Sequence, residues 1–562
     1  MSTYRPDNPL IVQSDHTVLA EVDSPRHAEA RDHLLRFAEL IKSPEHIHTY
    51  RITPLSIWNA CAAGLKSDYI VLTLQEYAKY PIPEHIAVEI RDYASRYGRL
   101  QLKRGDIGLI LSAADLPLAE EISRSKPVIP LLGQRISSTD FHIEPISRGR
   151  LKQALIKIGF PAEDLAGYTE GEVLPISLRV AAHSGTAFGL RHYQTEAAAA
   201  YYANGSERGG SGVIVLPCGA GKTVVGMACM AQVQSSTLIL TTSVTAVRQW
   251  IAELLDKTDL TEEQIGEYAG SSKEIRPVTI ATYQIMTWRG SKDGDFPHLA
   301  LFDQRNWGLI IYDEVHLLPA PVFQVTAGLQ ARRRLGLTAT LVREDGREDD
   351  VFALIGPKKV DVPWKEMESQ GWIATARCTE VRLPMPEELR MTYAVADARQ
   401  KFRIASENPL KLDIARKIIE MHRDKQILVI GMYIEQIHRL AEGLNIPVLT
   451  GQTSQKKRDS LFTDFKSGKL KILAVSKVAN FAVDLPDASV AIQISGTFGS
   501  RQEEAQRLGR ILRPKGGMNQ AFFYTLVSRD TVEQNFALNR QLFLCEQGYE
   551  YFIRDAEEIS QA

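Results

Sequence analysis

The chain of 562 residues is too long for one hydrophobic core, and this length predicts about three to four domains. With 44% hydrophobic and 24% charged residues, the composition is that of a soluble globular protein, and the formal net charge of −2 excludes a global field that attracts polyanions. The five cysteines form no C-x-x-C pair and have no partnering histidines, which disfavours a disulfide framework, a zinc ribbon and an iron–sulfur cluster.

The sequence also disfavours a membrane protein. No apolar run is long enough to span a bilayer, and the first residues, MSTYRPDNPLIVQSDHTVLAEV, lack the charged start and apolar block of a signal peptide. We therefore expect a cytoplasmic protein. Any contact with nucleic acid must come from local groups of basic residues.

The first third of the chain predicts two small units. Residues 1–115 mix short strands with helical stretches and predict an α/β N-terminal domain, and residues 116–184 predict a second unit with a linker. Within the second unit, 138–160 reads as a strand followed by an amphipathic helix with basic residues around its apolar positions, namely Arg148, Arg150, Lys152 and Lys157. A solvated basic face and a DNA-contacting face are both open interpretations.

Two consecutive series of apolar strands and helices follow. The first, over 185–365, has its strands in GVIVLP, STLILTT, VTIATY, WGLIIYDE and RLGLTAT. The second, over 366–562, has them in ILVIGM, IPVLTG, ILAVS, VAIQIS and AFFYTLV. Short apolar strands separated by helices predict parallel sheets covered on both faces. The expected fold class is α/β, with two tandem parallel-sheet lobes after the small N-terminal domains.

The stretch VIVLPCGAGKTVVGMACM, residues 213–230, has the strand–loop–helix context of a phosphate-binding loop, but Leu216 stands where the pattern G-x-x-x-x-G-K-[ST] has its first glycine. The two later glycines let the backbone wrap a phosphate, and the helix start adds its positive dipole end. Lys222 is expected to reach the β- and γ-phosphates, and Thr223 to ligate magnesium. The predicted nucleotide contacts of the loop are Pro217, Cys218, Gly219, Ala220, Gly221, Lys222 and Thr223.

A second motif, WGLIIYDEVHLLPA at 307–320, ends a hydrophobic strand on two carboxylates, at the edge where open α/β sheets bind their ligands. Asp313 is expected to hold magnesium, and Glu314 to orient and deprotonate the attacking water. His316 either caps a turn or senses the γ-phosphate. Upstream of the loop, Gln194 in LRHYQ stands at a distance suited to reading an adenine base.

The second lobe contains EEAQRLGRILRPKG at 503–516, in which Gln506, Arg510 and Arg513 fall close to one helical face. Arginines on a surface helix are usually solvated. Here they are also suited to reach across a cleft and stabilise the charge of the transferring phosphoryl group, which the first lobe alone cannot surround.

In this order, LPCGAGKT, DEVH, GLTATLVRED and QRLGRILR resemble the motifs of superfamily-two helicases, which often lack the first glycine of the loop. The phrases DEVHLLPA, LTGQTSQKKR, IQISGTFGSRQEEAQRLGR and RDTVEQNFALNRQLFLCEQGYEY narrow the resemblance to the XPB family of DNA repair and transcription helicases. The resemblance covers roughly 185–555 strongly and 10–115 weakly. It implies RecA-like lobes, ATP and Mg²⁺ as cofactors, and 3′-to-5′ unwinding of DNA, with a role in repair of the nucleotide excision type.

The resemblance assigns roles to further segments. The triplet Arg343, Glu344 and Asp345 resembles the family's strand-separating element, residues 387–408 stand where the family has a DNA-gripping thumb, and 116–184 occupies the place of its damage-recognition-like domain. The match departs at Ala479, Asn480 and Phe481, where relatives commonly have Gly-Asp-Thr, while Asp484 is retained and is assigned to the nucleotide site.

A motor needs groups on both lobes that hold a phosphate backbone. Hydroxyls, amides and N–H groups suit such contacts. The candidates are Arg248 with the following Gln249 and Trp250, Thr282 with Tyr283, Thr453 with Ser454 and Gln455, and Arg501. Two hypotheses follow. In the first, the protein is an ATP-driven DNA helicase that acts on duplex with a single-stranded tail, a fork or a bubble. In the second, it is an ATP-gated module that opens DNA for a partner nuclease and unwinds little.

Overall fold

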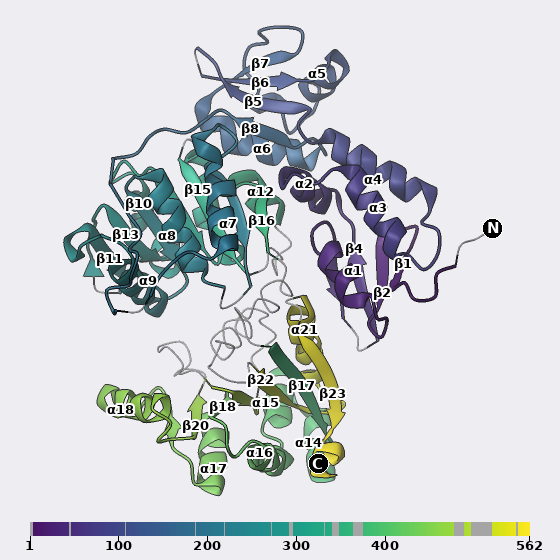
Figure 1. Ribbon diagram of the computed structural model, residues 1–562, viewed down its shortest axis with the longest axis vertical. Coiled ribbons are helices and arrows are strands. Elements are labelled where there is room, and N and C mark those ends of the chain that lie inside the picture. The colour runs from purple at the N-terminus through teal and green to yellow at the C-terminus, as the bar shows by residue number, and fades with distance from the viewer. Residues whose placement is uncertain are drawn as a thin grey trace.

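The computed structural model describes residues 4–43, 46–106, 108–185, 187–217, 220–270, 272–291, 296–330, 332–339, 348–362, 375–476, 488–495, 520–546 and 549–561. Within them the chain forms two small sheets from its first third and two large, mainly parallel sheets from the rest (Figure 1). The α/β class and the two tandem lobes predicted from the sequence are confirmed. In the described part of the chain, no helix has the length and apolar character needed to cross a membrane.

The N-terminal domain is an antiparallel sheet in the order β1-β2-β4-β3, packed against four helices. Its strands alternate as a half-buried sheet requires: in β2, Val18 and Ala20 are buried and their neighbours are not. Helix α2 begins with a capping box in which Thr53 and Ser56 exchange side-chain-to-backbone hydrogen bonds. The elements are β1 (Leu10–Val12), β2 (Thr17–Glu21), α1 (His27–Leu34), β3 (Glu39–Lys42), β4 (Ile47–Arg51), α2 (Pro54–Ala62), α3 (Ser67–Tyr77) and α4 (Glu84–Arg96).

The second domain is a four-stranded sheet in the order β7-β6-β5-β8. Its elements are β5 (Leu100–Arg104), β6 (Leu109–Ala113), α5 (Leu116–Ser123), β7 (Asp140–Ile143), α6 (Arg148–Lys157) and β8 (Ala162–Leu165). The strand and helix predicted within 138–160 are confirmed as β7 and α6. The domain boundary predicted at 115/116 falls inside this sheet, between its strands β6 and β7. The sequence did not show this, because the pairing partners of strands of four or five residues cannot be read from their sequence.

Only two of the four basic residues predicted around helix α6, Arg150 and Lys157, are exposed, and the other two are buried. Arg148 and Lys152 are 3% and 5% exposed and form ion pairs with Asp164 of β8, at 2.8 and 2.9 Å. A buried carboxylate therefore attracts these two cations into the domain interior, where a charge needs a partner.

The second domain packs closely on the first lobe. Helix α6 contacts α11 (Ala320–Gly328) and α12 (Glu348–Leu354), and a Cβ at Gly149 would lie 2.5 Å from the Ala327 carbonyl oxygen. The Gln153 amide donates to Asp350 Oδ1 at 2.6 Å. Only glycine allows the two helices to approach this closely.

The sheet of the first lobe has the order β12-β11-β13-β10-β14-β15-β9-β16, and all its pairings are parallel except that of β12 with β11. Strands β9, β10 and β13 are buried along their whole length, because helices cover both faces. The strands are β9 (Ser211–Val215), β10 (Thr237–Thr241), β11 (Ile265–Ala269), β12 (Ser272–Lys273), β13 (Val278–Thr282), β14 (Leu309–Asp313), β15 (Arg333–Thr338) and β16 (Lys358–Asp361).

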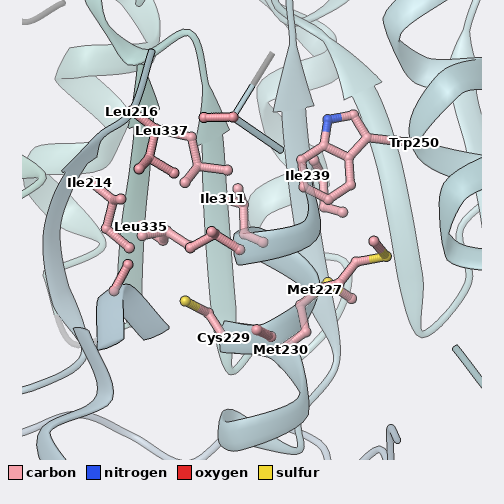
Figure 2. Packing of buried hydrophobic residues seen from close by; sticks show 14 of the residues in the cluster. Ile214, Leu216, Met227, Cys229, Met230, Ile239, Trp250, Ile311, Leu335 and Leu337 are labelled. Carbon is pink, nitrogen blue, oxygen red and sulfur yellow. The ribbon is translucent and has the colours of Figure 1, made fainter. Parts of the chain in front are cut away.

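Helices α7 (His192–Tyr202), α8 (Lys222–Val233), α9 (Val244–Lys257) and α10 (Tyr283–Met286) belong to the same lobe. Figure 2 shows the core where strand side chains meet those of α8 and α9. The sheet contributes Ile214, Ile239, Ile311, Leu335 and Leu337, together with Leu216 directly after β9, and the helices contribute Met227, Cys229, Met230 and Trp250. This packing fixes α8, and with it the position of Lys222 at its start.

The sheet of the second lobe is parallel throughout, in the order β19-β20-β18-β21-β22-β17-β23. Its strands are β17 (Thr375–Leu383), β18 (Ile427–Gly431), β19 (Val448–Leu449), β20 (Ile472–Ser476), β21 (Val490–Gln493), β22 (Gln520–Ser528) and β23 (Glu550–Asp555). Its other helices are α16 (Leu410–Met421), α17 (Ile434–Leu444), α18 (Gln455–Lys466), α21 (Val532–Glu546) and α22 (Ala556–Gln561). The thumb-like segment 387–408 forms two helices in contact, α14 (Glu387–Val395) and α15 (Ala398–Ser406).

The N-terminal domain contacts both lobes (Figure 1). Towards the first, the Lys358 backbone N–H donates to Asn59 Oδ1 at 2.9 Å. Towards the second, α21 packs on β3, and Cys545 of α21 lies within the N-terminal hydrophobic core. The two lobes are therefore connected twice, by the chain segment between them and by their contacts with the N-terminal domain.

Candidate functional site

The register of the first lobe brings its polar strand ends to one edge. Thr241 of β10 pairs with Thr282 of β13, Asp313 of β14 pairs with Leu337 of β15, and Thr338 of β15 pairs with Val215 of β9. Since all these strands run parallel, their carboxyl ends meet at the same edge, which is where the loop after β9 also begins. The phosphate loop and the acidic motif are therefore neighbours, as the sequence predicts.

The loop explains why Leu216 can stand in place of a glycine. Leu216 is completely buried, and its N–H donates to the Thr338 carbonyl at 2.9 Å, which continues the ladder of β9. The need for glycine arises at Gly221, where φ is +78° and a Cβ would lie 2.7 Å from Gln194 Nε2. Cys218 and Gly219 lie outside the described residues, while Pro217 is buried.

Gln194 and Tyr193 of α7 hold the phosphate loop by hydrogen bonds to its backbone. Gln194 Nε2 and the Tyr193 hydroxyl both donate to the Ala220 carbonyl, at 3.1 and 2.7 Å. The Gln194 side chain is 3% exposed, and its Oε1 accepts the Arg191 N–H at 3.0 Å. In this arrangement Gln194 holds the loop, and its contact with an adenine base remains a prediction.

Lys222 and Glu314 form an ion pair at the sheet edge. Lys222 Nζ lies 2.7 Å from Glu314 Oε1, with the two side chains 14% and 15% exposed. Lys222 is the first residue of α8 and Thr223 is the second, at a helix start that favours anions. Glu314 has a left-handed backbone, with φ at +52°, which is costly for a residue with a side chain and is often found at functional sites.

The negative charge at this sheet edge exceeds the positive charge, which favours binding of a cation. Burial raises the pKa of Glu314, but Lys222 and His316 outweigh this effect and hold it below its usual value, so the carboxylate is ionised. Burial and the neighbouring Glu314 raise the pKa of Asp313 to about 6. Two adjacent carboxylates thus share one ammonium group, and a hard divalent cation such as Mg²⁺ fits the oxygen ligands and the missing charge.

Three side chains orient Asp313, and the sequence did not predict this. Trp250 Nε1 and the Thr241 hydroxyl donate to Asp313 Oδ2, at 2.9 and 3.4 Å, and the Tyr283 hydroxyl donates to the Asp313 carbonyl at 3.0 Å. From the sequence, Trp250 and Tyr283 were candidates for DNA contact, but they are 1% and 5% exposed and face the acidic motif. Their position within apolar stretches was the signal that favoured burial.

His316 connects the acidic motif with the segment GLTAT. Its Nδ1 lies 2.6 Å from the Thr338 hydroxyl and 3.6 Å from Glu314 Oε2, and the side chain is buried. The imidazole therefore contacts both the carboxylate that is predicted to act as base and the end of β15. This position suits the transmission of a change at the phosphate to the segment that follows Thr338.

The predicted DNA contacts differ in how accessible they are. The Arg248 side chain is 73% exposed, with a distant ion pair to Glu267 at 3.9 Å. Thr282 is buried, and its hydroxyl caps α10 by accepting the Ile285 N–H at 3.2 Å. In the second lobe, the Thr453 hydroxyl accepts the Thr450 N–H at 3.0 Å, just before α18. Outside the described residues lie Arg343, Glu344, Asp345, Asp484, Arg501, Gln506, Arg510 and Arg513.

Comparison with known families gives three matches along the chain. Residues 367–561 match the ERCC3/RAD25/XPB C-terminal helicase, residues 187–343 match the type III restriction enzyme res subunit, and residues 10–137 match a helicase conserved C-terminal domain. The phosphate loop and the acidic motif lie within the second of these regions, and the motif at 503–516 lies within the first.

Full-length relatives agree with these matches. The chain is 55% identical to a DNA 3′-5′ helicase XPB of Kineococcus radiotolerans, over 98% of this chain and 97% of that protein. It is 54% identical to a DNA 3′-5′ helicase XPB of Mycobacterium tuberculosis, over 98% and 99%. It is 33% identical to a general transcription and DNA repair factor IIH helicase/translocase subunit XPB of Enterocytozoon bieneusi, over 97% and 92%.

Two lobes of mainly parallel strands, with a lysine at the start of a helix and paired carboxylates at a strand end of the same sheet edge, are the arrangement of a helicase-type enzyme. Such a site is built for phosphoryl transfer to water. The chain belongs to the XPB family of DNA helicases.

Proposed function

We propose that this protein hydrolyses ATP at the Lys222–Glu314 site and uses the energy to move 3′ to 5′ along DNA and separate its strands, in repair of the nucleotide excision type. The observation that carries the proposal is the 2.7 Å contact between Lys222 and Glu314, next to the buried Asp313. The names of the relatives support the reaction and its polarity.

The residues of the site have distinct tasks in this proposal. Lys222 exchanges its ion pair with Glu314 for the terminal phosphates, which leaves the Glu314 carboxylate available to accept a proton from water. Asp313, oriented by Trp250, and Thr223 hold the magnesium ion. Bound MgATP supplies the phosphoanhydride bond and an ion that balances the two carboxylates.

In this proposal, residues of the second lobe complete the ATP site. Arg510 and Arg513 are expected to reach the γ-phosphate, with Gln506 beside them and Asp484 on the nucleotide side. Contacts from both lobes favour closure around the nucleotide, and hydrolysis removes the difference in contacts that favours it. Arg248, Thr282, Thr453 and Arg501 are the proposed contacts to the DNA track. A partner nuclease finds no support in the names of these relatives, which describe helicases or a translocase subunit.

A strand-displacement assay tests the proposal. Purified protein with ATP and Mg²⁺ is added to duplexes with a 3′ tail, a 5′ tail or blunt ends, made of DNA and of RNA. We expect displacement of the DNA duplex with the 3′ tail, and ATP hydrolysis that rises when DNA is added. Hydrolysis that is indifferent to every nucleic acid would contradict the proposal, and the Lys222→Ala variant is the control for contaminating activity.

The charged triplet Arg343, Glu344 and Asp345 provides a second test. Carboxylates repel a phosphate backbone, so the triplet is suited to part strands and not to hold them. Alanine at all three positions is expected to lower unwinding far more than DNA-stimulated hydrolysis. If both activities fall together on the same tailed duplex, the triplet belongs to the coupling of ATP and not to strand separation.

A further inference from the structure

A cavity of about 430 Å³ lies where three parts of the molecule meet. Residues of α2 in the N-terminal domain, of β8 and α6 in the second domain, and of β9 and β16 in the first lobe line it. Figure 1 shows α2, α6, β8 and β16 where these parts meet. It is separate from the nucleotide site, since none of the described residues of the phosphate loop or the acidic motif lines it. Its volume is within the range of small-molecule sites, and such sites often occur between domains.

The cavity is rich in positive charge. Lys152, Arg208 and Lys359 line it, against the carboxylates of Glu163 and Asp164. Two more cations, Arg148 and Arg334, lie directly behind this wall and act on the charge of Lys152. Three cations thus line the cavity with two carboxylates, and Arg148 and Arg334 add positive charge close to Lys152 outside the lining.

The carboxylates are already shared among these cations. Asp164 accepts from both Arg148 and Lys152, at 2.8 and 2.9 Å, and Glu163 lies 3.1 Å from Arg208 Nε. Arg334 is completely buried, and its Nη2 has no hydrogen-bond partner among the residues that the structure describes. Buried charge without a counter-charge is costly, so a bound anion would stabilise this arrangement.

Lys359 shows the same shortage of negative charge. Its ammonium group donates to the Arg208 carbonyl at 2.8 Å, so its hydrogen bond goes to a neutral group. Burial lowers the pKa of Lys359, and the attraction of Glu163 does not fully compensate. The preceding Lys358 does not line the cavity and is paired with Asp361 at 2.6 Å. Lys358 is therefore a matched control, because it is an adjacent lysine of the same strand whose ammonium group already has a carboxylate partner.

We propose that this cavity binds a small phosphate-bearing anion, which contacts Lys152 of the second domain together with Arg208 and Lys359 of the first lobe. Ammonium and guanidinium groups are the usual phosphate ligands of proteins. Tyr97 and Phe352 also line the cavity and provide ring surfaces beside the cations. The ligand is therefore either phosphate alone or a nucleotide whose base packs on these rings, and the two share the same anionic contact.

Binding is measured by calorimetry with the full chain carrying Lys222→Ala, so that the nucleotide site contributes little. The probes are inorganic phosphate, pyrophosphate and AMP. We expect at least one of them to bind, and Lys359→Gln to weaken its affinity at least tenfold. Lys359→Arg, which keeps the charge, and Lys358→Gln are expected to change the affinity less than threefold. Circular dichroism confirms that each variant is folded.

The results distinguish phosphate from a nucleotide as the ligand, and they show whether the site exists. Equal affinity for phosphate and AMP identifies phosphate as the whole ligand, whereas tighter binding of AMP assigns a role to the ring surfaces, and both support the site. Absence of binding by all three probes overturns the proposal. Binding that Lys359→Gln leaves unchanged also overturns it, because the anion is then held elsewhere on the molecule.

Discussion

Each lobe contains a lysine–glutamate pair, and the two pairs differ in almost every respect except their length. In the first lobe, Lys222 and Glu314 are 2.7 Å apart, about one-seventh exposed, and Glu314 has a left-handed backbone. In the second, Lys411 and Glu533 are 2.8 Å apart and only 1% and 4% exposed. The second pair is surrounded by further partners: Lys411 also donates to the Ile494 carbonyl, and Glu533 accepts from Ser406 and from the Ser528 N–H.

The difference shows what each pair is suited to do. A buried pair whose members also bond to their surroundings holds elements in place, and here it joins α16, α21 and the end of α15. A pair at an accessible helix start, one of whose members has a strained backbone, can separate so that the lysine binds an arriving anion. The same chemistry thus stabilises the fold in one lobe and prepares a reaction in the other.

The largest effect is expected from Glu314→Gln. The carboxamide cannot accept a proton from water, so ATP hydrolysis should fall by about 10²–10⁴-fold while ATP still binds. Steady-state hydrolysis and nucleotide binding on the same sample measure the two quantities. Near-normal turnover would remove Glu314 from the role of base.

Lys411→Met is expected to affect stability and not chemistry. It leaves the Glu533 carboxylate buried without its counter-charge, which costs about 3–5 kcal/mol. The double variant with Glu533→Gln removes the charge but keeps an acceptor for the Ser528 N–H, and should recover at least half of the loss. Hydrogen exchange of the α16 amides reports the opening free energy. Equal protection in the single variant and the wild type would contradict the structural role.

Lys222→Ala is expected to show the opposite pattern. Loss of a charge that contacts the transferring phosphoryl group should lower hydrolysis by about 10²–10³-fold. Glu314 remains near His316 and is partly exposed, so thermal unfolding should change far less than for Lys411→Met. A large loss of stability in this variant would make the two pairs alike and would contradict the comparison.

The smallest effect is expected from Gln194→Ala. This change removes the amide that donates to the Ala220 carbonyl, at a cost of about 1 kcal/mol, and should weaken ATP binding several-fold without changing the hydrolysis rate at saturation. Titration of hydrolysis against ATP concentration separates the two. A lower rate at saturation would show that Gln194 also acts during the reaction.

Residues in one motif were predictable from the sequence, because their spacing and local context determine their geometry. Lys222, Asp313 and Glu314 are of this kind, and so are the strands that carry them. The contact of Trp250 with Asp313 was not predictable, because it depends on the sheet order β13-β10-β14, which chain order does not give. The Lys411–Glu533 pair joins residues 122 positions apart, and no local signal connects them.

The position of Cys545 has a consequence for the chemistry of thiols. This residue belongs to the second lobe but is 4% exposed, because it lies within the hydrophobic core of the N-terminal domain. An alkylating reagent can reach the sulfur only when the two parts separate, since reaction requires access to the thiolate. In a chain whose other cysteines are replaced, the rate of alkylation at Cys545 would therefore report how often the second lobe separates from the N-terminal domain.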